Sequence, residues 1–229
     1  MRGRKPIIAI DGPVGAGKST TARRVAEELC YLYVDTGAMY RAVTLDVLDH
    51  GIDPEDEIGV EDIVCSSKIE LMIDDRGQRT FLNGKDVSER IRDRDVTKAV
   101  SSVSAMKAVR DRMTELQREL GFKGGIVMEG RDIGTVVFPD AEFKIYLDAS
   151  PEIRAQRRYE ELSAKGATIT YNKLLDEIKE RDRLNTMREI APLRKAEDAI
   201  TVDTTNLTLE EQVREILLIV KGENEAGKK

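Results

Sequence analysis

The chain is poor in the residues that build metal and redox sites. Its 229 residues include two cysteines, Cys30 and Cys65, and a single histidine, His50. The cysteines form no C-x-x-C pair, so a Cys/His zinc site is excluded, and we expect both thiols to be buried as small apolar side chains. His50 precedes Gly51 in a pattern that is typical of a helix end, and we assign it no catalytic role.

Long apolar runs and an excess of positive charge are also missing. The longest apolar run, residues 216–220, is too short to cross a bilayer, and the basic first five residues lack the apolar stretch of a signal peptide. The net charge of −6 argues against a nucleic-acid-binding surface. We therefore expect a cytoplasmic monomer that binds small molecules and neither membrane nor nucleic acid.

Residues 12–20 carry the most informative motif, Gly-Pro-Val-Gly-Ala-Gly-Lys-Ser-Thr. It fits the phosphate-binding pattern G-x-x-x-x-G-K-[ST], and it lies between an apolar run and a helix-forming run. Glycines let successive backbone N–H groups face an anion, and the helix N-terminus adds partial positive charge. The alternative is a glycine-rich turn that only links strand to helix, and the complete motif in this context disfavours it. The motif predicts ATP binding by Gly12, Pro13, Val14, Gly15, Ala16, Gly17, Lys18, Ser19 and Thr20, with the Ser19 hydroxyl on Mg²⁺.

Short apolar segments alternate with amphipathic helical stretches along most of the chain. This alternation predicts an α/β fold of three layers, in which helices cover both faces of a five-stranded parallel sheet. The expected strands are 7–10, 31–34, 126–128, 143–147 and 199–202. Each is followed by an acidic residue: Asp11, Asp35, Glu129 with Asp132, Asp148 and Asp203. Ligands bind at this end of such sheets, although for Asp148 and Asp203 we prefer the interpretation that they cap the following helices.

Other segments depart from this alternation. Strand-like runs within 69–90, with the turns Asp74-Asp75-Arg76-Gly77 and Asn83-Gly84, predict a small antiparallel sheet inserted in the fold. The apolar periodicity further predicts one long helix over 96–120, two helices around Gly166, and a last helix over 209–220. The tail, 222–229, is expected to be disordered.

A second anion site is indicated by short motifs that follow two of the strands. Thr36 and Arg41 would present a hydroxyl and a guanidinium on the first turns of one helix; the alternative is a helix that Thr36 caps, with a solvated Arg41. Arg131 can bind phosphate bidentately, and Asp132 can accept a hydrogen bond from a base. Arginines in 154–188 could close over a transferring phosphoryl group as a mobile lid, although we expect about half of them to be ordinary surface residues.

The chain resembles the bacterial cytidylate kinases, a branch of the nucleoside monophosphate kinases, from about residue 7 to 220. The resemblance rests on Asp11–Ser19, Asp35-Thr36-Gly37 with Tyr40-Arg41, Ile178–Asp182, Ala191–Leu193, and above all on Gly-Arg-Asp-Ile-Gly-Thr-Val-Val-Phe-Pro at 130–139. It implies a P-loop core at 1–40, 91–150 and 189–229, a monophosphate-binding insertion with the small sheet at 41–90, and an arginine-rich helical lid at 151–188. The implied activity is phosphoryl transfer from ATP, with Mg²⁺, to CMP and dCMP.

The resemblance also implies roles for individual residues. Arg157 would reach ATP from the lid, and Asp132 with Ser101 would recognise the cytosine edge. Those expected to carry the transfer are Lys18, Arg131, Arg181 and Arg188. Those expected to bind CMP are Thr36, Arg41, Ser101, Arg110, Arg131, Asp132, Arg181, Asn185 and Arg188. Asn185 departs from the family pattern, in which aspartate is common, and this changes the expected strength of ribose recognition.

Two other functions remain open at this point. A kinase for UMP or another monophosphate would use the same loop, but a carboxylate at Asp132 suits the amine of cytosine and disfavours the carbonyl of uracil. A P-loop switch without an acceptor substrate would not need the second cationic site or the arginine-rich helices.

Overall fold

The chain forms two compact units in the computed structural model, which describes residues 4–74, 77–164, 166 and 168–222. One unit comprises residues 1–33 and 123–229, and the other comprises residues 34–122. The tail predicted to be disordered, 222–229, lies outside the described residues except for 222. The two central residues of the predicted turn at 74–77 also lie outside them. The division into core, insertion and lid stays a prediction.

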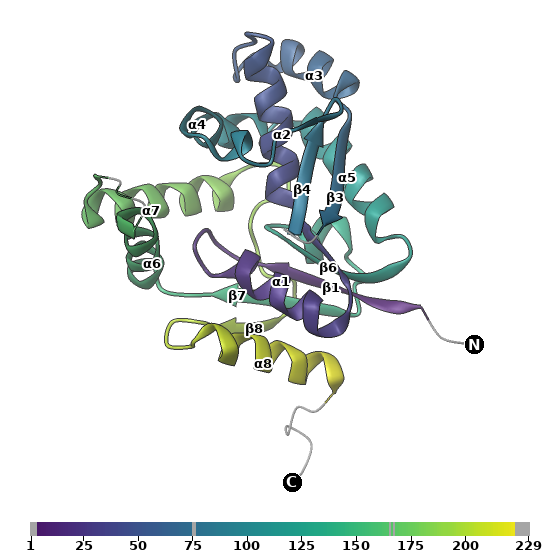
Figure 1. The fold of residues 1–229 in the computed structure, drawn as a ribbon, viewed down its shortest axis with the longest axis vertical. Helices are drawn as coiled ribbons and strands as arrows, with labels where there is room; N and C mark the ends of the chain where they lie inside the picture. The colour runs from purple at the N-terminus through teal and green to yellow at the C-terminus, as the bar shows by residue number, and fades with distance from the viewer. Residues whose placement is uncertain (1–3, 75–76, 165, 167, 223–229) are drawn as a thin grey trace. The chain divides into compact units, whose positions relative to one another are not determined.

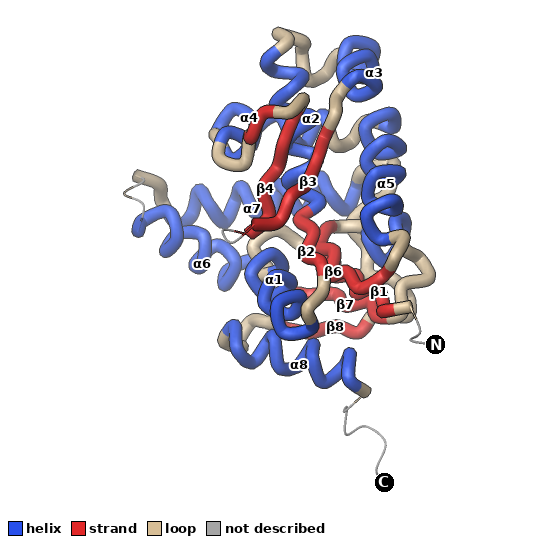
Figure 2. The backbone as a smooth tube through the Cα atoms, turned by 45° about the vertical axis from the view of Figure 1, so that its right-hand side comes forward, coloured by secondary structure: helices blue, strands red, loops and turns tan. Residues whose placement is uncertain are grey.

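A five-stranded sheet forms the centre of the first unit (Figure 2). Its strands are β1 (Lys5–Asp11), β2 (Leu32–Asp35), β6 (Gly124–Gly130), β7 (Phe143–Asp148) and β8 (Ile200–Asp203), in the order β2-β6-β1-β7-β8. β2 crosses from this unit into the second. β1 pairs in parallel with both β6 and β7, and β7 pairs in parallel with β8. The predicted parallel sheet is confirmed, and each strand begins and ends within two residues of the expected positions.

Two helices lie side by side along this sheet, α1 (Lys18–Leu29) and α8 (Leu209–Lys221) (Figure 1). Their apolar faces and the sheet share one core, which includes Ile8, Ile10, Val25, Val127, Ile145, Leu147, Val202 and Ile216. Two further helices, α6 (Pro151–Ala164) and α7 (Tyr171–Met187), pack against each other, as predicted for the segment around Gly166. A π-helical turn, η2 (Ile133–Val137), follows β6.

The second unit combines helices with a small antiparallel sheet. Its elements are α2 (Thr36–Asp49), α3 (Glu57–Ser66), β3 (Ile69–Asp74), β4 (Gly77–Leu82), β5 (Lys85–Asp86), the 3₁₀ turn η1 (Arg90–Arg92), α4 (Arg94–Val103) and α5 (Lys107–Gly121). The predicted sheet is confirmed, in the order β3-β4-β5. Asn83 and Gly84 have φ of 50° and 80°, as a tight hairpin turn requires. No helix in the described ranges is long and apolar enough to cross a membrane.

Two predictions about this architecture were wrong. The expected helix over 96–120 is two helices, because the chain is extended at Met106 (φ −70°, ψ 139°), between α4 and α5. Buried residues such as Val103 and Val109 lie on either side of the break, so the apolar pattern continues through it. Both cysteines are exposed rather than buried.

Candidate active site

The loop between β1 and α1 is shaped for close approach of its backbone to a ligand. Gly12, Gly15 and Gly17 have φ of 153°, 78° and 90°. A Cβ at Gly12 would lie only 2.0 Å from the carbonyl oxygen of Leu147, so no other residue fits there. Gly17 is the N-cap of α1 and supplies no side-chain cap, and the first turn of α1 has no acidic residue. The helix N-terminus therefore suits an external anion.

Lys18 and Ser19 are both held by neighbouring groups. Lys18 is 5% exposed, and its ammonium donates to the carbonyl oxygen of Pro13 at 2.7 Å. The Ser19 hydroxyl donates to Glu129 Oε1 at 2.5 Å, and Tyr33 donates to the same oxygen at 3.3 Å. The sequence marked Glu129 as an acidic residue at a strand end, but its contact with Ser19 was not predicted.

The pair of Ser19 and Glu129 fits the ligands that Mg²⁺ uses in nucleotide sites. Mg²⁺ is usually bound by one or two carboxylates together with substrate phosphates and waters. Within the described part of the chain, no group of three or more His, Cys, Asp or Glu residues could hold a metal. A hydroxyl and a carboxylate beside a helix N-terminus are donors that suit Mg²⁺ when phosphate oxygens supply further ligands.

Asp11 joins the end of β1 to the loop that follows β6. Its two carboxylate oxygens accept hydrogen bonds from the backbone N–H groups of Ile133 at 2.9 Å and Gly134 at 2.7 Å. Burial raises the pKa of Asp11 to about 6, although these hydrogen bonds oppose the rise, and the charge of Lys18 opposes it more weakly. The contacts fix the start of η2, directly after Asp132.

The residues at the start of that loop meet the end of α7. Asp132 Oδ1 lies 3.8 Å from Arg188 Nη2, and both side chains are at most 10% exposed. Arg188 Nε donates to the carbonyl oxygen of Ala191 at 2.5 Å, and Arg131 Nη1 donates to that of Gly130 at 3.1 Å. The structure thus places a carboxylate acceptor beside a guanidinium donor, and this pairing was not predicted.

Arg181 and Asn185 lie one turn apart on α7, and both are half-buried. The backbone carbonyl of Asn185 accepts a hydrogen bond from Leu193 N at 2.8 Å, so the chain folds back over the end of the helix. α7 ends at Met187, and Arg188 has extended backbone angles (φ −63°, ψ 142°). The spacing of Arg181, Asn185 and Arg188 at i, i+4 and i+7 predicts one shared helical face. That prediction is wrong for Arg188, which lies beyond the end of the helix.

Arg157, on α6, lies beside the phosphate-binding loop. Its Nη1 and Nη2 donate to the hydroxyl and the carbonyl oxygen of Thr204, at 3.1 and 2.6 Å. The Thr204 hydroxyl is also 3.2 Å from the carbonyl oxygen of Ala16 in the loop. Burial lowers the pKa of Arg157. These contacts connect Arg157 to the phosphate-binding loop through Thr204.

Arg154 has a different position from the other arginines of α6. It is 3% exposed, and its guanidinium donates to the carbonyl oxygens of Ala149 at 2.8 Å and Val14 at 3.0 Å. It also forms an ion pair with Asp182 of α7 at 2.6 Å. Arg154 thus links the phosphate-binding loop to both helices, and sequence reasoning had placed it only among the lid arginines.

Several other arginines in this region make surface ion pairs. Arg158 pairs with Glu161 and Arg183 with Glu180, each three residues apart on one helix and about half exposed. These pairs match the expectation that part of the arginine set is an ordinary charged surface.

In the second unit, Asp35 rather than Thr36 is the N-cap of α2. Asp35 Oδ1 accepts a hydrogen bond from Ala38 N at 3.1 Å, so the alternative interpretation, in which Thr36 caps this helix, does not hold. Thr36 is the first residue of α2 and is buried. A Cβ on Gly37 would lie 3.2 Å from Arg41 Nη1, which places the Arg41 guanidinium over the first turn.

Arg110 packs against the same helix. Its side chain is 3% exposed, its guanidinium lies 5.2 Å from the centre of the Tyr40 ring, and Nη1 donates to the Ser104 carbonyl oxygen at 3.2 Å. Ser101 lies on α4 and is half-buried. The first turns of α2 therefore carry one cation, Arg41, and have a second, Arg110, packed nearby.

Asp148 and Asp203 do not cap the following helices. Their carboxylates accept hydrogen bonds from backbone N–H groups one and two residues further on, at 2.8 and 2.9 Å. The Ser150 hydroxyl accepts from an N–H in the first turn of α6, and Thr208 caps α8. Both acidic residues stabilise local turns instead.

Comparisons with known proteins identify the family of this chain. The sequence profile described as "Cytidylate kinase" matches residues 8–222. A cytidylate kinase from Carboxydothermus hydrogenoformans is 52% identical over 95% of this chain and 98% of its own length, and one from Bacillus subtilis is 49% identical over 95% and 97%. The crystal structure of an uncharacterized protein from Eubacterium ventriosum has a TM-score of 0.52 at 12% identity and covers 95% of this chain and 99% of that one, which supports the fold alone. The chain belongs to the cytidylate kinase family.

Proposed function

We propose that this protein transfers the γ-phosphoryl group of ATP to CMP and dCMP, and releases ADP with CDP or dCDP. One observation carries the proposal. In the parallel pairing of β1 with β6, Asp11 lies opposite Gly130. The phosphate-binding loop and the Arg131-Asp132 motif therefore leave adjacent strands at the same level, which supports assigning the donor to the loop and the acceptor to the motif.

The donor side follows from the loop. Backbone N–H groups of residues 12–20 would hold the phosphates, and Lys18 would leave the Pro13 carbonyl to bind the outer ones. Ser19 and Glu129 would hold Mg²⁺, which neutralises charge on the phosphates when it is bound. Arg157, beside the loop, would contact the nucleotide from α6.

Residues assigned to the acceptor nucleotide occur in each unit. In the first unit, we assign the CMP phosphate to Arg131 and the exocyclic amine of cytosine to the Asp132 carboxylate, since a carboxylate accepts from an amine. Arg181, Asn185 and Arg188 would contact the sugar and the phosphates. In the second unit, we assign CMP binding to Thr36, Arg41, Ser101 and Arg110.

No residue in this set needs to act as a general base. A phosphate oxygen of CMP is already ionised near neutral pH, so the enzyme must hold it in line with the γ-phosphoryl group and stabilise the charge of the transition state. Lys18, Arg131, Arg181 and Arg188 are the cations assigned to that task. Exclusion of water would prevent hydrolysis of ATP, and we assign it to α6 and α7.

A coupled ADP-release assay with CMP, dCMP, UMP and no acceptor tests the proposal. We expect fast release with CMP and dCMP, much slower release with UMP, and almost none without an acceptor. Equal rates with CMP and UMP would make the protein a general pyrimidine monophosphate kinase. Release that does not depend on any acceptor would favour a P-loop switch or ATPase.

A further inference from the structure

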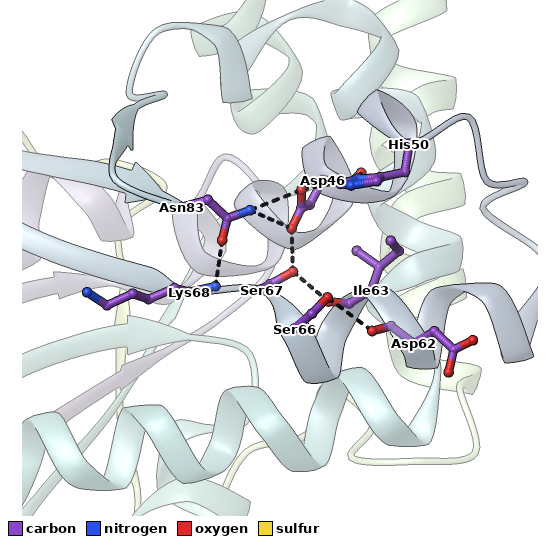
Figure 3. A network of polar contacts seen from close by, with 8 residues as sticks. All are labelled: Asp46, His50, Asp62, Ile63, Ser66, Ser67, Lys68 and Asn83. Carbon is purple, nitrogen blue, oxygen red and sulfur yellow. Dashed lines mark hydrogen bonds and ion pairs between the residues drawn. The ribbon is translucent and has the colours of Figure 1, made fainter.

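The inserted sheet is attached to helix α2 at two separate points. Near the start of α2, the Gln78 side chain accepts a hydrogen bond from Asp35 N at 2.8 Å. Near its end, the Asn83 amide donates to the two oxygens of the Asp46 carboxylate at 3.4 and 3.2 Å (Figure 3). Strand β4 therefore lies along α2 with a polar contact at each end.

The spacing of the two attachments matches the geometry of the two elements. Asp35 and Asp46 are eleven residues apart, which in a helix corresponds to roughly 16 Å. Gln78 and Asn83 are five residues apart, which in a strand also corresponds to roughly 16 Å. A shift of either element by one residue would break at least one contact, so the pair of contacts sets the register of β4 on α2.

The face of β4 that carries Gln78 is the buried one. Thr80 and Leu82, two and four residues further on, are 2% and 5% exposed, and β4 packs on α2. Arg79 points to the other face, where it forms an ion pair with Asp86 and lies over the Phe81 ring. Gln78 is thus placed against α2 by the alternation of the strand itself.

The Asp46 carboxylate makes polar contacts with several elements (Figure 3). Asp46 is 4% exposed, and its carboxylate also accepts a hydrogen bond from the Ser67 hydroxyl at 2.5 Å. His50 Nδ1 lies 3.4 Å from Asp46 Oδ1, and Asn83 Oδ1 accepts from Lys68 N at 2.9 Å. One buried carboxylate thus joins the end of α2, the end of α3 and the β4–β5 turn, which is an arrangement for stability.

The attachment at Gln78 acts on a different part of the helix. Asp35 is the N-cap of α2, and its carboxylate holds the N–H of Ala38. A Cβ on Gly37 would meet both Asp35 Oδ1 at 3.0 Å and the Arg41 guanidinium at 3.2 Å, so these groups pack closely around the first turn. The Gln78 side chain satisfies the Asp35 N–H and thereby fixes the residue on which this packing depends.

We propose that the inserted sheet fixes the position of α2 and that Gln78 is a positioning residue for the acceptor monophosphate. This inference rests on the proposed function, in which Thr36 and Arg41 contact CMP. Gln78 touches neither the nucleotide nor the transferring group in this assignment. It acts through Asp35, by holding the first turn of α2 in the conformation that presents Thr36 and Arg41.

The test compares Gln78→Met with two control variants. Arg79→Gln alters the opposite face of the same strand. Asn83→Gly removes the contact with Asp46, and glycine readily adopts the left-handed backbone at this position. For Gln78→Met we expect KM for CMP to rise about five- to tenfold, as the loss of one hydrogen bond predicts, with kcat and KM for ATP within about twofold of wild type. Asn83→Gly should lower the unfolding midpoint and leave KM for CMP unchanged, and Arg79→Gln should change neither.

An unchanged KM for CMP in folded Gln78→Met overturns the inference, and so does a rise of similar size in either control. Amide hydrogen exchange of Asp35 in the wild-type protein, followed by NMR, gives a second measurement that needs no variant. We expect this amide to be protected, and fast exchange would overturn the inference. If the wild type releases no ADP with CMP, the proposed function fails, while the exchange measurement still decides whether Gln78 holds the helix.

Discussion

Replacement of Arg154 by methionine is expected to be the most damaging single change among the arginines of α6. The guanidinium makes an ion pair with Asp182 at 2.6 Å and hydrogen bonds to the carbonyl oxygens of Val14 and Ala149. Methionine keeps much of the apolar volume of the side chain but none of its donors. The substitution therefore removes the polar contacts and leaves the packing largely intact.

The magnitude follows from what the substitution leaves behind. Breaking a buried ion pair by removal of one partner costs about 3–5 kcal/mol, because the other charge stays buried. The Asp182 side chain is 22% exposed, so water recovers part of that cost, while two carbonyl oxygens lose a donor. We expect a loss of about 3 kcal/mol of unfolding free energy, which corresponds to a fall in Tm of roughly 6–12 °C for a chain of this size.

Urea and thermal unfolding of Arg154→Met, with Arg158→Met as the matched control, measure this loss. Arg158 lies one turn further along the same helix and pairs with Glu161 at the same 2.6 Å, but that pair is about half exposed. Its loss should cost less than about 1 kcal/mol. The Val14 carbonyl lies in the phosphate-binding loop, so KM for ATP should also rise in Arg154→Met and stay unchanged in the control.

Asp182→Asn and the double variant complete the test. If the ion pair causes the effect, the sum of the stability losses in Arg154→Met and Asp182→Asn should exceed the loss in the double variant by at least about 1 kcal/mol. A loss in Arg154→Met no larger than that in Arg158→Met would refute the reasoning, because burial would then make no difference to the value of the contact.

The remaining predictions concern the site itself. Lys18→Ala should reduce turnover at least about 100-fold in a protein that still unfolds cooperatively, and normal turnover would remove the loop from the mechanism. Asp132→Ala should narrow the preference for CMP over UMP in the ADP-release assay, whereas an equal loss with both acceptors would assign Asp132 to folding. Asn185→Asp should tighten CMP binding by about 1 kcal/mol in a titration, because a carboxylate makes charge-assisted hydrogen bonds, and no change for CMP or dCMP would mean that this side chain does not contact the sugar. Burial raises the pKa of Asp11 to about 6 in the folded protein, from 3.8 for an exposed carboxyl. As pH rises from about 3 to about 7, the unfolded state loses this proton first, so stability should fall by about 3 kcal/mol relative to Asp11→Asn in urea unfolding. A pH-independent difference would contradict this.

The parts of the fold that sequence predicts well depend on local geometry. The glycines of residues 12–17 and the pair Asn83-Gly84 occupy backbone conformations that few other residues adopt, so their positions locate the phosphate-binding loop and the hairpin turn. The buried strands are equally visible, because parallel strands are apolar on both faces. These features are set by neighbouring residues in the chain, and sequence displays them directly.

Other features depend on contacts between segments that are distant in the chain, and local sequence patterns do not indicate them. Arg188 was placed on a helical face by its spacing, but the backbone leaves the helix one residue earlier, and its position is set by Ala191 and by Asp132, 56 residues away. The break between α4 and α5 was hidden because buried residues continue on both sides of it. Cys30 ends α1 with a left-handed backbone and is exposed, although its apolar character indicates burial.

Three carboxylates with little exposure show how such distant contacts fix the working parts of the protein. Asp11 joins β1 to the loop after β6, Asp46 joins α2 to the β4–β5 turn, and Asp182 joins α7 to Arg154. Burial of a carboxylate adds little net stability, and for Asp11 the raised pKa records a direct cost. Burial of an apolar residue at each position would cost less free energy than burial of a carboxylate. Such a residue would accept no hydrogen bond, so the loop or helix beside it could occupy several arrangements. Each hydrogen-bonded carboxylate therefore holds one arrangement of the segments that it joins, and phosphoryl transfer depends on such placement.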